Sequence, residues 1–138
     1  MFMNIIYLCP SGNYASLVAA NIHLNKLKNN ATIKEVEQLP YYLDINSTKG
    51  QFYFIGLDNK KRSVYTLAIE THPSIITKTA EDLMKISQKN DKEIKLVDVS
   101  PFTPKYIKLR KSPFFKKILT KHISKMLLEI DRLVQNNT

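Results

Sequence analysis

The sequence NIIYL at Asn4–Leu8, followed at once by CPSGNYAS at Cys9–Ser16, decides how this chain folds. The first run is apolar and typical of a buried strand, the second is a loop of small residues, and an apolar segment with helical periodicity follows over Leu17–Leu27. In a strand–loop–helix unit the free N–H groups at the helix N-terminus favour an anion. We therefore predict anion binding or thiol chemistry here, with the anion held by Ser11, Gly12, Asn13 and Ser16 and with Cys9 as the candidate nucleophile.

Length and composition indicate one globular domain. The chain has 138 residues, of which 43% are hydrophobic and 24% are charged, and these proportions are those of folded rather than disordered proteins. The apolar runs are too short for a transmembrane helix, and the first residues lack the pattern of a signal peptide. A single cysteine cannot form an internal disulfide, which suits a reducing compartment. We expect a cytoplasmic protein.

The net charge of +9 is concentrated in the last part of the chain. Residues 1–100 contain 12 Lys or Arg and 10 Asp or Glu, a balance of +2, whereas residues 101–138 contain 9 and 2, a balance of +7. We therefore predict an α/β core over 1–100, and over 101–138 a proline-containing connector and a long basic helix packed on the same domain. Such asymmetry indicates an acidic partner, a nucleic acid or an anionic membrane, or else a solvated helix face.

The remaining elements alternate between helices and strands. They are a helix capped by Thr32 with Glu35 completing a capping box, a hairpin around the turn Asp58–Arg62, a helix over 75–88 and a strand over Glu93–Val99. This order predicts an α/β fold, a three-layer sandwich with a mixed four-stranded sheet. We expect the first strand and the Glu93–Val99 strand to lie parallel and central in that sheet.

The last helix, predicted to begin after the N-cap Ser112, is amphipathic and basic. Its predicted partner-binding residues, with those just before it, are Lys108, Arg110, Lys111, Phe114, Lys116, Lys117, Lys121 and Lys125. We expect these residues to bind a protein partner or a second copy of the chain. Nucleic acid or an anionic membrane is the alternative, because aromatic residues interleave with the lysines, although no known nucleic-acid motif accompanies them.

The Cys9–Ser16 loop is similar to the loop of low-molecular-weight tyrosine phosphatases, which reads Cys, five residues, Arg, then Ser or Thr. Cys9 and Ser16 stand at the matching separation, but Ala15 occupies the position of the arginine that binds phosphate with two hydrogen bonds. The general acid is not evident either, since Asp98 falls inside a predicted strand. A phosphatase-like enzyme, with Cys9 as nucleophile and Ser16 steadying its thiolate, is therefore the alternative hypothesis.

Cofactor and metal sites are not predicted. The sequence contains neither the phosphate-binding motif Gly-x-x-x-x-Gly-Lys-Ser/Thr nor the dinucleotide-binding motif Gly-x-Gly-x-x-Gly. The three histidines lack metal-ligand spacing. His23 lies on the first predicted helix beside Leu24, where we expect a hydrogen-bonded structural residue. Cys9 has a structural interpretation as well, as a buried thiol that behaves like a small hydrophobic residue.

Several motifs in the same order resemble a family of small proteins of unknown function from spore-forming bacteria. The matching segments are Tyr7-Leu8-Cys9, Asn21-Ile22-His23-Leu24, Leu39-Pro40-Tyr41, Phe54-Ile55-Gly56-Leu57-Asp58 and Leu96-Val97-Asp98. The loop departs from the family pattern, because Ser11 replaces a glycine, Tyr14 a histidine and Ala15 a serine. The resemblance implies a degenerate anion-binding loop in a non-enzymatic regulatory or scaffolding protein with a role in sporulation.

Overall fold

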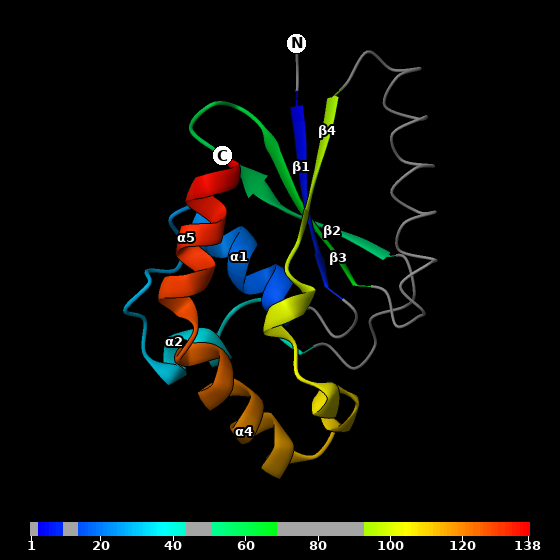
Figure 1. Cartoon of the computed structure of the whole chain (residues 1–138), viewed down its shortest axis with the longest axis vertical. Helices are drawn as coiled ribbons and strands as arrows, with labels where there is room; N and C mark the ends of the chain where they lie inside the picture. Colours follow the sequence, from blue (N-terminus) through cyan, green and yellow to red (C-terminus); the bar gives the residue numbers. More distant parts are fainter. Residues whose placement is uncertain (1–2, 10–13, 44–50, 69–92) are drawn as a thin grey trace.

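A mixed four-stranded sheet forms the centre of the fold (Figure 1). The computed structural model describes residues 3–9, 14–43, 51–68 and 93–138. The strands are β1 (Met3–Cys9), β2 (Gln51–Leu57), β3 (Ser63–Ala68) and β4 (Glu93–Asp98), in the order β2-β3-β1-β4. β1 runs parallel to β3 and β4, whereas β2 and β3 form the predicted antiparallel hairpin. The α/β fold with a mixed four-stranded sheet is confirmed.

The position of β4 differs from the prediction. β1 is central, with β3 on one side and β4 on the other, so β4 is an edge strand of the sheet formed by the described residues. On the side of β1 opposite β4, β3 pairs with β1, and β2 pairs with β3 in turn. The composition of β4 suits an edge, because Glu93, Lys95 and Asp98 place charges within a six-residue strand.

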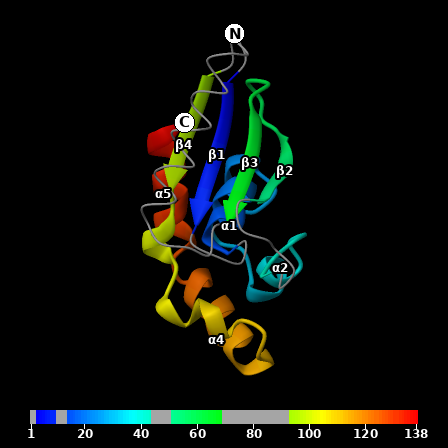
Figure 2. The same cartoon turned by 90° about the vertical axis from the view of Figure 1, so that its right-hand side faces the viewer.

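Helices cover one face of the sheet. The described helices are α1 (Ala15–His23), α2 (Ile33–Glu37), α4 (Pro113–Ser124) and α5 (Leu127–Asn137), with 3-10 turns at η1 (Ser100–Phe102) and η2 (Lys105–Leu109). Figure 2 shows α1 and α5 behind the sheet, on the same face. The helix predicted over 75–88 lies outside the described residues. None of the described helices has the length and apolarity needed to cross a membrane.

β1 is buried on both faces, as a central parallel strand should be. Ile5, Tyr7 and Cys9 belong to the core cluster beneath α1 and α5, while Ile6 and Leu8 pack with Leu67 on the other face. Strand residues alternate between faces, so this division fixes the side of the sheet from which each β1 residue is reached. Cys9 therefore faces the helices.

The ends of the first two helices follow from local chemistry. α2 begins with the predicted capping box, in which the Glu35 N–H donates to Thr32 Oγ1 at 3.2 Å and the Thr32 N–H donates to Glu35 Oε1 at 3.3 Å. α1 ends earlier than predicted. Asn25 adopts the left-handed conformation with φ 58°, which stops a helix, and the Lys26 N–H then donates back to the Asn21 carbonyl.

The prediction of one long C-terminal helix is wrong, because the helix breaks at Lys125 and Met126 into α4 and α5. The apolar repeat continues through the break, yet the two halves pack on different elements: α4 against α2 and η2, and α5 against α1. Ser112 is the N-cap residue of α4, as predicted, although its side chain makes no capping hydrogen bond. Residues of α4 and α5 share one core cluster with β1 and α1.

Candidate functional site

The loop between β1 and α1 is bounded by two buried polar side chains. Cys9 is the last residue of β1 and Ser16 the second residue of α1, and their side chains are 1% and 0% exposed. Ser16 Oγ donates a hydrogen bond to Cys9 Sγ across 3.1 Å. Cys9 and Ser16, whose separation in the sequence matches that of a phosphatase loop, are therefore in contact in the fold.

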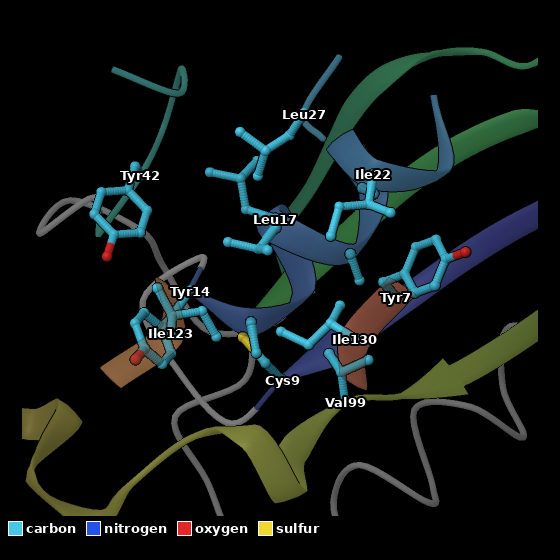
Figure 3. Close-up of a cluster of buried hydrophobic side chains, with 14 of the residues drawn as sticks. Tyr7, Cys9, Tyr14, Leu17, Ile22, Leu27, Tyr42, Val99, Ile123 and Ile130 are labelled. Atoms are coloured by element: carbon cyan, nitrogen blue, oxygen red, sulfur yellow. The ribbon is translucent and has the colours of Figure 1, made fainter. Parts of the chain in front are cut away.

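Tyr14, the residue before α1, lies in the core rather than in the loop. Its side chain is fully buried, and Figure 3 shows it beside Ile123 of α4. Its hydroxyl donates to the Leu119 carbonyl across 2.6 Å. Burial raises the pKa of Tyr14 well above its ordinary value, so the phenol stays neutral and remains a donor. Tyr14 thus joins the start of α1 to α4.

The predicted anion site is only partly within the described residues. Ser11, Gly12 and Asn13 lie outside them, so this part of the prediction stays a prediction. Ser16 is described, and its hydroxyl proton is directed at the Cys9 sulfur. A hydroxyl donates one proton, so this geometry leaves Ser16 no second O–H for an anion.

Asp98 lies at the carboxyl end of β4 and faces away from Cys9. Its neighbours Val97 and Val99 lie in the core cluster with Cys9, whereas Leu96 packs with the cluster on the other face. Alternation along β4 therefore places the Asp98 side chain on the face opposite Cys9. There its Oδ1 accepts hydrogen bonds from the backbone N–H and the hydroxyl of Ser100.

A chain of polar side chains that the sequence did not predict links α1 to the hairpin. Tyr7 Oη lies 2.6 Å from His23 Nδ1, and His23 Nε2 lies 2.8 Å from Asp58 Oδ2. Arg62 Nε donates to the same Asp58 oxygen across 2.7 Å. An ionised carboxylate only accepts, so Nε2 of His23 carries a proton and donates to Asp58, while the Tyr7 hydroxyl and Nδ1 share the second hydrogen bond of the ring.

The carboxylate of Asp58 is the electrostatic centre of this cluster. Burial would raise the pKa of Asp58, but hydrogen bonds from His23 and Arg62 and the charge of Arg62 outweigh it and lower the pKa to about 2. Burial raises the pKa of Tyr7 far above its ordinary value, so Tyr7 stays a neutral donor. The cluster is almost closed to solvent, and its groups satisfy one another, which is the arrangement of a structural network.

His23 is hydrogen-bonded, as predicted, and both of its ring nitrogens take part. Its partners were not predictable from local pattern, because Tyr7 and Asp58 are 16 and 35 residues away along the chain. Only the local role of Asp58 could be predicted from the sequence, because an aspartate at the start of a turn commonly accepts from nearby backbone N–H groups. Asp58 does so here, accepting from the backbone N–H groups of Lys60 and Arg62. Within the described part of the chain, no three His, Cys, Asp or Glu residues are grouped so as to hold a metal.

The predicted partner-binding residues divide into an exposed set and a buried residue. Lys111, Phe114, Lys116, Lys117, Lys121 and Lys125 are all exposed. Arg110 was placed in the same patch but is only 8% exposed, because it follows η2 at the point where the chain packs under α4. The side chain of Lys108 lies outside the described part of the structure.

Four exposed residues of this set form a line along α4. Phe114, Lys117, Lys121 and Lys125 follow the spacing i, i+3, i+7 and i+11, which keeps them on one side of a helix. We call these four residues the α4 stripe. Leu119 and Ile123, on the opposite side of α4, are fully buried in the core. The stripe therefore faces solvent because the other side of the same helix faces the core.

One comparison with known proteins gives a match. A family model described as "Protein of unknown function (DUF3189)" matches residues 4–137, which is almost the whole chain. The match includes β1, the Cys9–Ser16 loop and both C-terminal helices. No curated protein and no solved structure matches the chain.

Proposed function

We propose that this chain, which belongs to the DUF3189 family, is a non-enzymatic regulatory or scaffolding protein that acts by binding a partner. The observation that carries the proposal is the burial and hydrogen bonding of the Cys9 thiol. It is buried on the helix-covered face of the sheet and accepts a hydrogen bond from the buried Ser16 hydroxyl. A catalytic thiolate needs a substrate at its sulfur, and such cysteines sit in partly exposed, electropositive surroundings.

The surroundings of Cys9 support the same conclusion. Ala15 stands where a phosphatase loop carries its arginine, and a methyl group supplies no charge for a developing oxyanion. Asp98 lies on the opposite face of the sheet and does not reach a leaving group at Cys9. Among the described residues around the thiol, Tyr14 adds packing and a hydrogen bond to α4 rather than a catalytic group.

A cysteine-dependent phosphatase-like enzyme is the second candidate, and one observation favours it. A hydroxyl that donates to a cysteine sulfur stabilises negative charge there, and Ser16 is placed to do this. The burial of both groups and the missing arginine weigh against it.

An aryl phosphate assay tests the choice between these two candidates. Purified wild-type protein and the Cys9→Ala variant are incubated with p-nitrophenyl phosphate, with circular dichroism as the control that both are folded. We expect no turnover above buffer for either protein. Hydrolysis by the wild type that is lost in folded Cys9→Ala would overturn the proposal.

We also propose the cytoplasm of a spore-forming bacterium, during sporulation, as the setting. The support is the similarity of several ordered motifs to proteins of such bacteria and the single cysteine, which suits a reducing compartment. A small anion remains a proposed second ligand, bound at the N-terminus of α1 by Ser11, Gly12 and Asn13. Deletion of the gene should then lower the yield of heat-resistant spores and leave vegetative growth unchanged; unchanged spore yield would contradict this setting.

A further inference from the structure

The exposed side of α4 carries the clearest sign of a partner. We propose that the α4 stripe docks against an acidic helix of a partner protein, with Lys117, Lys121 and Lys125 pairing with carboxylates and Phe114 as the apolar anchor. This docking rests on the proposed binding role and names the surface and the chemistry of the partner.

Charge complementarity points to an acidic partner. Residues 99–128 contain eight Lys or Arg and no Asp or Glu, so nothing on this segment neutralises the lysines. The ion pairs found among the described residues both involve Asp58, far from α4, and none uses a lysine of the stripe. The positive charge of the stripe is therefore available to an external acidic group.

The spacing of the lysines matches a helix. Lys117, Lys121 and Lys125 are each four residues apart, which corresponds to about 6 Å of rise per step. Glu or Asp residues at i, i+4 and i+8 on a partner helix repeat with the same spacing, so two helices side by side can pair all three lysines at once. A partner with irregularly spaced charges would pair only some of them.

Phe114 gives the stripe an apolar end. It is 67% exposed, the largest value among the exposed large hydrophobic residues of the described chain. Large aromatic side chains are typical anchors at the centre of protein interfaces, where they are surrounded by polar contacts. Phe114 packs edge-on against Phe115, with ring centroids 5.4 Å apart, so its position is defined before any partner binds.

Nucleic acid fits this surface less well. Binding of single strands depends on exposed aromatic faces on which bases stack. Phe115 and Tyr106 are instead half-buried and pack on each other, with ring centroids 6.3 Å apart, and Tyr106 and Phe102 pack on the core. The charged residues of the stripe are all lysines, whereas planar recognition of phosphate favours arginine.

A membrane surface fits less well for a different reason. An interfacial helix buries its apolar face among the lipids. The apolar face of α4, which includes Leu119 and Ile123, is already buried in the core of the protein. Of the stripe, only Phe114 at the first turn of α4 has an apolar side chain to insert into a bilayer. Insertion of one side chain gives weak attachment.

A pair of synthetic peptides tests the docking. The probe is an alanine-rich helical peptide of about 20 residues, long enough to form an isolated helix, with Glu at every fourth position along one face. The control peptide has the same composition with its Glu residues distributed around the helix. Fluorescence anisotropy at low salt measures the binding of each peptide to the full chain. We expect the probe to bind roughly tenfold more tightly than the control; equal binding would overturn the proposal.

Charge reversal identifies the surface. Lys117→Glu with Lys121→Glu should weaken probe binding roughly tenfold or more, since each change removes an attraction and adds a repulsion. The matched control is Lys28→Glu with Lys61→Glu, which changes the net charge equally at two exposed lysines away from α4, Lys61 lying in the β2–β3 turn at the opposite end of the molecule (Figure 1). The control pair should bind like the wild type; an equal loss in both pairs would contradict docking at the stripe.

Two further measurements locate the binding surface and compare the acidic helix with the other partner classes. Chemical-shift changes in the wild-type protein on adding the probe should cluster at Phe114, Lys117, Lys121 and Lys125, which tests the surface without any variant. An oligothymidine strand and anionic phospholipid vesicles are titrated under the same salt conditions. Tighter binding of either one than of the probe would replace the acidic helix by that partner.

Turnover by Cys9 in the phosphate assay would refute the non-enzymatic role but leave helix docking standing, so the two failures are distinguishable.

Discussion

Ser16 Oγ lies 3.1 Å from Cys9 Sγ and donates a hydrogen bond to it, with both side chains buried where β1 ends and α1 begins. A strand–loop–helix unit of this kind can serve either a reactive thiol or a packed core. The Cys9 side chain lies among core residues on the helix-covered face of the sheet, as Figure 3 shows, and its hydroxyl partner lies equally deep. The same hydrogen bond that would support a thiolate here joins two elements of the core.

Removing the Ser16 hydroxyl should cost stability. Ser16→Ala deletes a buried hydrogen bond and is expected to lower the free energy of unfolding by about 1 kcal/mol. Urea denaturation measures the change. Ser112→Ala is the matched control, because the Ser112 side chain makes no capping hydrogen bond, and it should change stability by less than about 0.5 kcal/mol. A Ser16→Ala cost no larger than that of the control would show that the hydrogen bond is not stabilising.

The Asp58 cluster predicts a loss of stability in acid. The pKa of Asp58 is about 2 in the folded protein against 3.8 for an unperturbed aspartate. A lowered folded pKa means that the ionised carboxylate stabilises the fold above the unfolded pKa and that this contribution is lost as the pH falls from about 4 to about 2. A difference of nearly two pKa units corresponds to about 2 kcal/mol.

Denaturation of the Asp58→Asn variant checks this acid dependence. The variant should be less stable than the wild type at neutral pH, and the difference between the two should shrink as the pH is lowered through that window. Other carboxylates contribute equally to both proteins and cancel in the comparison. If the difference between variant and wild type stays constant from neutral pH to pH 2, Asp58 is not the group responsible.

Tyr7 should matter through its hydroxyl. Tyr7→Phe keeps the buried ring but leaves His23 Nδ1 without its hydrogen-bond partner 2.6 Å away, at an expected cost of about 1–3 kcal/mol. Tyr41→Phe is the control, because Tyr41 is exposed and its loss of a hydroxyl should cost less than about 0.5 kcal/mol. Thermal unfolding followed by circular dichroism compares the two. Equal costs would mean that the Tyr7–His23 contact adds nothing.

The two sides of α4 should respond differently to truncation. Ile123→Ala opens a cavity in the core and should cost about 2–5 kcal/mol. Phe114→Ala, on the α4 stripe, should change stability by less than about 0.5 kcal/mol and weaken binding of the acidic helical probe. Denaturant titration gives the stabilities of both variants. A large loss of stability in Phe114→Ala would assign Phe114 to the fold rather than to a docking surface.

Local features were predictable from sequence. The first strand, the β2–β3 hairpin and the capping box of Thr32 and Glu35 depend on residues that are neighbours in the chain, so a short window contains the whole cause. Alternation also predicts that Cys9 shares one face of β1 with Ile5 and Tyr7, once β1 is known to be a strand.

Features set by packing were not predictable in this way. The repeat of apolar residues runs unbroken past Met126, and the chain breaks there because α4 and α5 pack on different neighbours. Arg110 sits in a basic segment and is still buried, and His23 meets Asp58 across 35 residues. In each case the decisive partner is distant in sequence, so no local pattern contains it.

Alkylation of Cys9 by iodoacetamide tests the account most directly, because the reaction needs reagent at the sulfur. If the thiol is a packed core residue, the native protein should react roughly a hundredfold more slowly than the urea-unfolded chain at the same pH, since reaction waits for local opening. A native rate equal to or faster than the unfolded rate would show a thiol that is open and poised, and would contradict the account.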